Sequence, residues 1–299
     1  MTEVRACGSD SLMSELYFGY GSNLERDDFE RWCERKEFGD GHLDDVVGVA
    51  ALNDWALVFG RFSRGRNGGV LDVWPRLGYA VPGVLFEVDE EGFEALDAKE
   101  GAPAVYRREK VIVEYAGRDV EAWTYVVASP SQKVYAPALG YVDIVRLGYE
   151  RYGLDGAVLE AAAKGAREGV IGPPVSASLF VYGTLQGGER LSNYIDELKP
   201  VSITLATLTG RLFDLGTYPG LALDGDVAIQ GECLTFRDIS EALRVLDRVE
   251  GFEGYGERNN LYVRRLVTIG GEPTWTYLYV GGDEGIPIPH GDWQRWRTR

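Results

Sequence analysis

Histidine is scarce in this chain of 299 residues, which contains only His42 and His290. Both stand in Gly- and Asp-containing segments that are typical of loops. A Ser-His-Asp or Cys-His mechanism needs a histidine base beside an activated nucleophile, and neither histidine is accompanied by a serine elbow or a reactive-cysteine motif. The sequence therefore argues against such triads, and equally against a histidine-rich metal site.

Cysteine is nearly as scarce, with Cys7, Cys33 and Cys233 widely spaced along the chain. They form no CxxC pair, so the sequence suggests neither a disulfide framework nor a zinc site. A reducing cytoplasm is the expected location.

Positive charge is in short supply, since 31 Lys and Arg oppose 47 Asp and Glu, for a formal net charge of −16. Nucleic-acid and anionic-membrane partners need clustered basic residues, so we expect neither. No apolar run has the length of a signal peptide or a membrane span, and residues 1–13 are predicted to be a disordered leader. Met13 is an alternative start to Met1 because the first strand-like run follows it directly.

Nucleotide-binding motifs are also missing. There is no Walker A motif, and the segment 19–24 (Gly-Tyr-Gly-Ser-Asn-Leu) lacks the third glycine of a dinucleotide fingerprint. An enzyme built from this sequence must work with carboxylates, tyrosines and backbone amides, and we expect no metal and no organic cofactor.

The chain does contain an internal repeat. Its first half has a strand-turn segment at 16–24 (LYFGYGSNL), and the second half has a counterpart at 179–185 (LFVYGTL). Four further matches follow in the same order: 83–88 with 231–236, 95–101 with 245–251, 106–108 with 262–265, and 122–125 with 274–277. Five collinear matches predict two homologous domains of about 150 residues each.

The domain boundary is expected within 171–178, where two prolines and small residues interrupt an alanine-rich helical pattern. We predict domains at 14–170 and 177–299. Each half mixes β-branched and aromatic runs with a few helices, without regular alternation, which indicates an α+β fold. The first half alone carries an added helical stretch, 135–152.

A glutamate ends a predicted helix in each half, Glu100 before Gly101 and Glu250 before Gly251. The carbonyl end of a helix disfavours negative charge by roughly 0.3–1 kcal/mol, which raises a carboxyl pKa toward the range useful for proton transfer. A single helix-final glutamate would be interpreted as a solvated surface residue. Because both occur in the same Leu-Asp-x-x-Glu-Gly frame, we predict that Glu100 and Glu250 are catalytic.

The strand-turn segment offers a complementary anion site. A glycine there permits a sharp turn, and Ser22 with Glu25 makes a possible capping box that leaves amides free for a carboxylate or an oxyanion. The alternative is a simple turn. The candidate substrate-binding residues are Tyr20, Gly21, Ser22, Asn23 and Leu24 in the first half, and Tyr182, Gly183, Thr184 and Leu185 in the second.

Tyrosines from two other repeat segments are further candidates. Tyr125 and Tyr277, each in a Trp-Thr-Tyr sequence, are interpreted equally well as substrate-binding residues or as core aromatics. For Tyr106 and Tyr262 we favour packing in the core.

The motif order resembles that of a known superfamily. The first half is similar to γ-glutamylcyclotransferases of the glutathione and γ-glutamyl-amino-acid type, and the second to the γ-glutamylamine cyclotransferase branch. The matching segments are 20–24, 68–69, 96–101 and 130–135 in the first half, and 181–185, 188–190, 216–220, 246–251 and 291–293 in the second. The resemblance implies two tandem domains, each a small mixed β-barrel with flanking helices and a pocket between the turn and the glutamate.

The resemblance also implies a reaction that needs no nucleophile from the protein. The α-amine of a small γ-glutamyl amide attacks its own γ-carbonyl, which closes 5-oxoproline and releases the amine. Glu100 or Glu250 accepts and returns the proton, while the turn amides stabilise the oxyanion. Neither a metal nor a cofactor is implied, and the oligomeric state is left open.

Three functional hypotheses follow. The first is an enzyme with two active sites, the second is one catalytic domain beside a scaffold domain, and the third is a non-catalytic module that binds a carboxylate ligand. The segment between Glu250 and Tyr262 is longer than that between Glu100 and Tyr106. This difference is expected to reshape the second pocket and leaves room for two different substrates.

Overall fold

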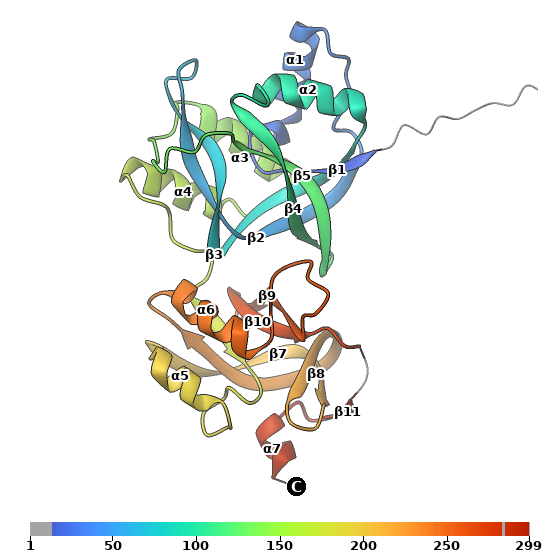
Figure 1. Ribbon diagram of the computed structural model, residues 1–299, viewed down its shortest axis with the longest axis vertical. Helices are drawn as coiled ribbons and strands as arrows, with labels where there is room; N and C mark the ends of the chain where they lie inside the picture. Colours follow the sequence, from blue (N-terminus) through green and yellow to red (C-terminus); the bar gives the residue numbers. More distant parts are fainter. Residues whose placement is uncertain (1–13, 283–284, 299) are drawn as a thin grey trace, which may run out of the picture. The chain divides into compact units, whose positions relative to one another are not determined.

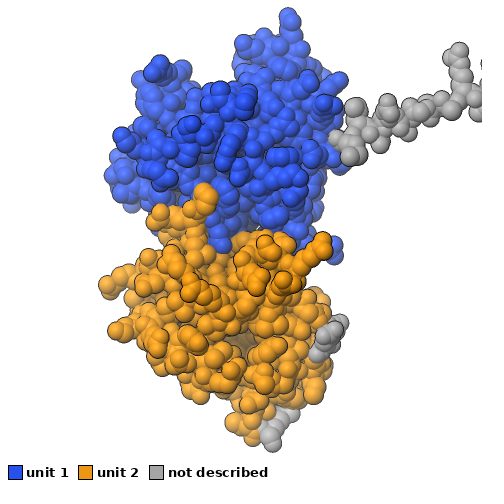
Figure 2. All heavy atoms as spheres, in the orientation of Figure 1, with its two compact units in different colours: residues 1–74, 81–173 blue, residues 75–80, 174–299 orange. Residues whose placement is uncertain are grey.

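The computed structural model describes residues 14–282 and 285–298, so the predicted leader 1–13 lies outside the described residues. The chain divides into two compact units, coloured separately in Figure 2. The first domain comprises residues 1–74 and 81–173, and the second comprises 75–80 and 174–299. Each has its own sheet and helices, which confirms the prediction of an α+β protein with two tandem domains.

The sheet of the first domain is a closed barrel (Figure 1). Strand β1 runs antiparallel to β3 and parallel to β5, where Tyr17 pairs with Trp123. The predicted mixed barrel is thus present, and its closure leaves no free strand edge. The order around the barrel is β1 (Glu15–Gly19), β3 (Gly68–Val88), β2 (Val46–Ser63), β4 (Tyr106–Tyr115) and β5 (Arg118–Val127).

Helix α2 (Glu90–Glu100) begins at Asp89, whose side chain accepts a hydrogen bond from the Gly92 amide at 2.8 Å. It ends at Glu100 because Gly101 adopts the left-handed conformation, with φ 65°. The glutamate therefore has the predicted helix-final position. The other helices of this domain are η1 (Ser22–Leu24), α1 (Arg26–Lys36), α3 (Tyr141–Tyr152) and α4 (Ala157–Arg167).

The sheet of the second domain curls into a half-barrel and stays open. Its short strand β6 lies antiparallel to β8 and parallel to β10, which repeats the placement of β1 between β3 and β5. The strand order is β11 (Ile286–Pro287), β7 (Ser202–Asp214), β8 (Pro219–Thr235), β6 (Ser178–Val181), β10 (Glu272–Tyr279) and β9 (Tyr262–Ile269).

Helix α6 (Ile239–Val249) is capped by Asp238, which accepts a hydrogen bond from the Ser240 amide at 2.9 Å. It ends one residue earlier than predicted, so Glu250 is the residue after the last helical one. The Glu250 amide still donates to the Leu246 carbonyl at 2.9 Å. The remaining helices are α5 (Ser192–Leu198) and α7 (Trp293–Arg297), and within the described residues no helix is long and apolar enough to span a membrane.

The glycine that opens a strand in each repeat has the same structural reason in both domains. A Cβ at Gly83 would lie 2.4 Å from a carbonyl oxygen of β1 and 2.5 Å from the ring of Phe18. A Cβ at Gly231 would meet a carbonyl oxygen of β6 and the ring of Phe180 at the same two distances. Only a residue without a side chain lets the short central strand pack this closely.

Two candidate active sites

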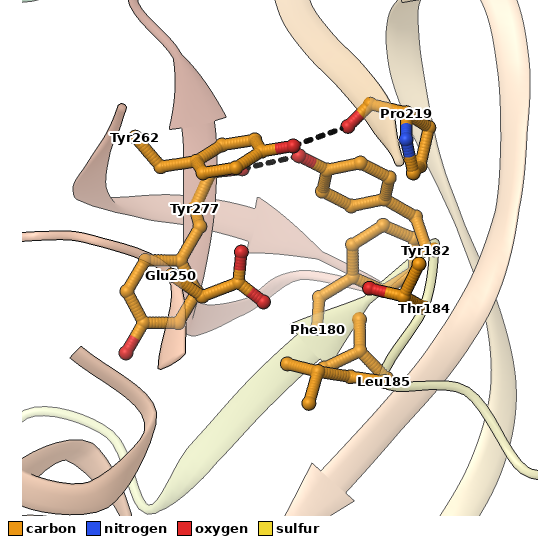
Figure 3. Close-up of a pocket in the computed structure, with 10 residues that line it drawn as sticks. Phe180, Tyr182, Thr184, Leu185, Pro219, Glu250, Tyr262 and Tyr277 are labelled. Carbon is orange, nitrogen blue, oxygen red and sulfur yellow. Dashed lines mark hydrogen bonds between the residues drawn. The ribbon is translucent and has the colours of Figure 1, made fainter. Parts of the chain in front are cut away.

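The second domain has a pocket of about 300 Å³ at the end of β6. In Figure 3 the Glu250 carboxylate points into the space between the rings of Tyr182 and Tyr262. Every residue predicted for the second site contributes to the pocket wall. The lining is Phe180, Val181, Tyr182, Gly183, Thr184, Leu185, Pro219, Glu250, Tyr262 and Tyr277.

The first domain has a corresponding pocket of about 330 Å³. Its lining is Tyr17, Tyr20, Gly21, Ser22, Asn23, Leu71, Glu100, Tyr106, Tyr125 and Tyr141. The predicted site residues of the first half thus come together, except Leu24. That side chain is fully buried in the core, where it packs against Gly19 and Gly148.

Tyrosine hydroxyls hold the turn of each pocket in place through hydrogen bonds to backbone carbonyls. The Tyr20 hydroxyl donates to the Tyr125 carbonyl at 2.6 Å, and the Tyr182 hydroxyl donates to the Tyr277 carbonyl at 2.7 Å. Each bond joins the turn after the short central strand to the strand beside it. The two turns are therefore held in the same place in the two domains.

A second pair of tyrosines secures the opposite wall. The Tyr106 hydroxyl donates to the Leu71 carbonyl at 2.7 Å, and the Tyr262 hydroxyl donates to the Pro219 carbonyl at 2.5 Å. Both tyrosines are buried, as expected for packing residues, yet their rings also line the pockets. Packing alone was too narrow an interpretation, because a pocket inside a barrel is walled by core side chains.

An aspartate anchors the glutamate-bearing helix of the first domain. Asp97, in the helical turn before Glu100, accepts hydrogen bonds from the Tyr125 hydroxyl at 2.7 Å and from Arg108 Nε at 2.8 Å. Burial raises the pKa of Asp97, but the bonds from Arg108 and Tyr125 outweigh it, and the pKa lies below its ordinary value. The charged aspartate thus ties α2 to β4 and β5.

The second domain repeats this arrangement. Asp247 accepts hydrogen bonds from the Tyr277 hydroxyl at 2.7 Å and from Arg264 Nε at 2.9 Å. The Arg264 side chain is fully buried, whereas its counterpart Arg108 is 33% exposed. The same anchor is therefore more deeply enclosed in the second domain.

These aspartates and arginines were not among the site residues predicted from the sequence. A signal was present, because they belong to the Leu-Asp-x-x-Glu-Gly and Tyr-x-Arg-Arg segments that occur in both halves. An aspartate three residues before each glutamate lies on the same helical face and points to a shared structural task.

The Glu100 carboxylate is buried in a polar setting. Asn23 Nδ2 donates to Glu100 Oε1 at 2.8 Å and to the Tyr17 hydroxyl at 3.1 Å. Burial raises the pKa of Glu100 above its ordinary value, and the Asn23 bond with the nearby charges of Lys99 and Arg61 partly offsets the rise. The prediction of a raised pKa is borne out, with burial as its main cause.

The Glu250 carboxylate is buried in a less polar setting. Leu185 occupies the position of Asn23, and within the described residues no side chain donates a hydrogen bond to Glu250. Burial alone raises the pKa of Glu250 to about 7. This carboxyl group therefore exchanges a proton near neutral pH.

The turn of the first domain differs in detail from the predicted capping box. The Leu24 amide donates to the Gly21 carbonyl at 3.1 Å, which makes a single 3-10 turn. The Glu25 side chain accepts from the Asp28 amide at 2.6 Å and caps α1, so it does not pair with Ser22. The box fails because the 3-10 turn moves the N-cap of α1 from Ser22 to Glu25, three residues later.

Both turns leave backbone amides that point to no acceptor. In the second turn the Gln186 amide donates to the Gly183 carbonyl at 3.0 Å, just as the Leu24 amide donates to the Gly21 carbonyl in the first. In each turn the two amides before this donor have no backbone acceptor within the described residues. They are the amides of Ser22 and Asn23, and those of Thr184 and Leu185. Consecutive free amides of this kind can bind an anion.

Acidic and thiol groups do not cluster in a way that suits a metal. Within residues 14–282 and 285–298, no group of three or more His, Cys, Asp or Glu side chains is arranged to hold a metal ion.

Known proteins share parts of this sequence. A γ-L-glutamyl-butirosin B γ-glutamyl cyclotransferase from Niallia circulans is 34% identical over 127 residues, which is 41% of this chain and 78% of that protein. The solved structure of a γ-glutamyl cyclotransferase is 22% identical with a TM-score of 0.42, covering 62% of this chain and 99% of that one. An uncharacterized Homo sapiens protein is 28% identical with a TM-score of 0.41, covering 54% and 89%.

The family comparison covers both domains. The sequence model described as "Gamma-glutamyl cyclotransferase, AIG2-like" matches the chain twice, at residues 17–141 and 179–295. The matched ranges contain both pockets and together span most of the chain. This chain therefore belongs to the γ-glutamyl cyclotransferase, AIG2-like family, of which it carries two tandem copies.

Proposed function

We propose that each domain cyclises a γ-glutamyl amide to 5-oxoproline and releases the amine, with Glu100 and Glu250 as the proton carriers. One observation carries this proposal: in both domains a buried carboxyl group with a raised pKa shares a pocket with a turn that has two free backbone amides. The first feature serves proton transfer and the second serves the oxyanion.

The reaction uses a nucleophile that the substrate brings with it. The glutamate takes a proton from the α-ammonium group, and the freed amine attacks the γ-carbonyl carbon to form the ring C–N bond. The ring nitrogen of the tetrahedral oxyanion gives up a second proton as the adduct collapses, the bond to the leaving nitrogen breaks, and the glutamate returns its proton to that nitrogen. The α-nitrogen thus loses two protons in all, and the leaving amine gains the one that the glutamate carries and a second from the ring nitrogen or from solvent. The pocket therefore needs to fold the substrate and carry these protons.

The pKa of Glu250 suits this proton transfer. An ordinary glutamate has a pKa of about 4.3, far below that of the α-ammonium group of an amino acid, so proton transfer to it is strongly uphill. Raising the pKa of Glu250 to about 7 makes the same transfer easier by roughly 3–4 kcal/mol, whatever the pKa of the ammonium group. Burial has thus removed a large part of the free-energy difference.

The remaining lining has binding roles in this proposal. The free amides of each turn stabilise the oxyanion or hold the substrate carboxylate, and Tyr125 and Tyr277 wall the glutamyl group. The substrate is a small γ-glutamyl molecule. Cys33 and Cys233 are free thiols, which fits the reducing cytoplasm in which we place the reaction.

Release of 5-oxoproline tests the proposal. The substrates are glutathione, γ-glutamyl amino acids and γ-glutamyl alkylamines, and the proteins are wild type, Glu100→Gln, Glu250→Gln and the double variant. Loss of a proton carrier is expected to lower kcat by about 10²–10⁴-fold in its own domain, and the double variant is expected to be inactive. Loss through only one of the substitutions would identify a single working site.

Glu168→Gln is the matched control. Glu168 directly follows the last residue of helix α4 and precedes Gly169, which has φ 78°, but it is exposed and lines neither pocket. Its substitution is expected to leave release unchanged. Activity that survives in the double variant, or a wild type that cyclises none of the substrates, would refute the proposal.

A further inference from the structure

The first pocket continues into a larger outer hollow of about 670 Å³. The two share Ser22, Glu100, Tyr106 and Tyr141, so Glu100 stands where they join. A glutamate that returns its proton to the leaving nitrogen must lie beside that nitrogen. The outer hollow is therefore the space next to Glu100 that the leaving group can occupy.

Two arginines from one hairpin face this hollow. Arg61 lies near the end of β2, and Arg66 lies in the turn that leads to β3. The Arg61 guanidinium is 5.5 Å from the ring centre of Tyr106, and that of Arg66 is 5.1 Å from the ring centre of Tyr141. These rings belong to both the inner pocket and the outer hollow, so the two positive charges stand at the passage between them.

Neither guanidinium is neutralised by the protein. In the part of the chain that the structure describes, Arg61 and Arg66 make no side-chain hydrogen bond and no ion pair with a carboxylate. Acidic residues outnumber basic ones by 47 to 31, so partners are not lacking overall. Other arginines do find them, as Arg108 does with Asp97, Arg146 with Glu160, and Arg211 with Asp224.

A third cation adds to the local potential. Lys99 also lines the outer hollow, but its Nζ lies 3.6 Å from the Asp28 carboxylate and against the Phe29 ring. Glu100 is the only acidic residue in the lining of the hollow. The hollow consequently attracts a negatively charged group.

The two inner pockets do not differ in cationic lining, because neither contains Arg or Lys. The difference lies beside the matched tyrosines. Tyr262, the counterpart of Tyr106, is packed edge-on by Tyr218 and Tyr279, with ring centres 6.3 and 5.9 Å away. An aromatic wall thus stands beside Tyr262, whereas the Arg61 guanidinium stands over the ring of Tyr106.

We propose that Arg61 and Arg66 bind a carboxylate on the leaving group, so that the first domain acts on γ-glutamyl amino acids or peptides. The second domain has aromatic rings and not a guanidinium beside the matched tyrosine, so no preference for this carboxylate is expected there. The guanidinium fork matches a carboxylate in shape as well as charge, which gives discrimination as well as affinity. This inference rests on the proposed function and assigns the two arginines as specificity determinants.

A matched pair of substrates isolates the carboxylate. γ-Glutamyl-alanine and γ-glutamyl-ethylamide share one carbon skeleton and differ only by a carboxylate in place of a hydrogen. In the Glu250→Gln background, which reports the first domain, we expect kcat/KM to favour γ-glutamyl-alanine by at least about tenfold. In the Glu100→Gln background, we expect the second domain to show no such preference.

The arginine variants identify the source of the preference. Arg61→Gln with Arg66→Gln is expected to lower kcat/KM for γ-glutamyl-alanine by at least about tenfold and for the ethylamide by no more than about twofold. The ratio of the two substrates is the readout, because any change in Glu100 affects both. Equal losses on both substrates would overturn the inference.

Arg64→Gln is the matched control. Arg64 lies in the same turn, carries the same charge and is exposed like Arg66, but it does not line the hollow. Its substitution is expected to leave the substrate ratio unchanged. If Arg64→Gln changed the substrate ratio as much as the double arginine variant does, the preference would come from the overall positive charge of the turn. That result would contradict a binding role for Arg61 and Arg66.

Binding separates failure of this inference from failure of the proposed function. Calorimetry on the Glu100→Gln, Glu250→Gln protein is expected to show γ-glutamyl-alanine binding at least about tenfold more tightly when Arg61 and Arg66 are present. If this binding difference is found but the wild type cyclises no substrate, only the proposed function is refuted. If the wild type cyclises both substrates without preferring the carboxylate, only this inference is refuted. A protein that does not bind γ-glutamyl-alanine would also refute this inference.

Discussion

The first domain closes its barrel and places Asn23 beside its glutamate, whereas the second domain stays a half-barrel and places Leu185 at that position. Behind both glutamates the tyrosine-to-carbonyl bonds and the aspartate anchor are the same. The shared parts fix where the carboxylate stands. The parts that differ decide how readily it ionises and, in the reaction that we propose, what charge the leaving group meets.

Barrel closure is therefore not needed to build this pocket. The short central strand, the turn after it and the anchored helix end are enough to bring the glutamate to the free amides. The surroundings can then vary, as the arginines of the first domain and the aromatic wall of the second illustrate.

The aspartate anchors give the largest expected difference in stability. Arg264→Met leaves Asp247 14% exposed and without its buried partner, so we expect a loss of about 3–5 kcal/mol in the free energy of unfolding. Arg108→Met is expected to cost about 1 kcal/mol, because water screens that pair. Urea unfolding measures both, and equal losses would show that the two anchors do not differ.

The raised pKa of Glu250 makes the stability of the protein depend on pH. With its pKa raised to about 7 when folded, the folded state holds a proton that the unfolded state has lost, so stability falls as pH rises from about 4.5 to 7. We expect Glu250→Gln to stabilise the protein by up to about 3 kcal/mol at pH 8.5 and to change little at pH 5. Melting temperatures at the two pH values test this, and the opposite pH trend would contradict it.

An exchange of side chains next to the glutamates sharpens the comparison of their pKa values. Asn23→Leu removes a hydrogen bond to charged Glu100 and is expected to move the acid limb of kcat/KM up by about 1–2 pH units in the first domain. Leu185→Asn is expected to move that of the second domain down. Each pH profile of kcat/KM is measured in a protein whose other domain carries the Glu→Gln substitution. Acid limbs that do not move would mean that Asn23 does not cause the difference between the two glutamate pKa values.

The smallest expected effect should be equal in the two domains. Tyr20→Phe and Tyr182→Phe each remove one hydroxyl-to-carbonyl bond and are expected to lower the free energy of unfolding by about 1 kcal/mol. Thermal unfolding of the two variants measures it. Clearly unequal losses in the free energy of unfolding would show that the two hydrogen bonds share their geometry but not their contribution to stability.

Much of this architecture could be predicted because the same local sequence patterns occur in both halves of the chain. Gly101 and Gly251 mark where the helices stop, and a helix stop is a local property of the chain, so Glu100 and Glu250 were located within one residue. The turn residues were located for the same reason. Leu24 was not, since the 3-10 turn that points it into the core depends on α3.

Other features depend on contacts between distant segments. Arg61 and Arg66 reach the Glu100 pocket only because β2 and β3 form a long hairpin that returns toward Tyr141. Neither arginine lies in a segment that was matched between the two halves, so the repeat could not reveal them. The pKa of Glu250 likewise follows from burial by residues of four strands, whereas the helix end alone predicts a smaller shift.

The hydrogen bonds of the second-domain tyrosines have one more consequence. Tyr182, Tyr262 and Tyr277 each donate their phenolic proton to an oxygen of the protein. None of the three hydroxyls is left to take up or lend a proton during a reaction. The cavity thus offers a proton a single resting place, on Glu250, and a proton drawn from one end of a bound molecule can be handed only to another atom of that molecule.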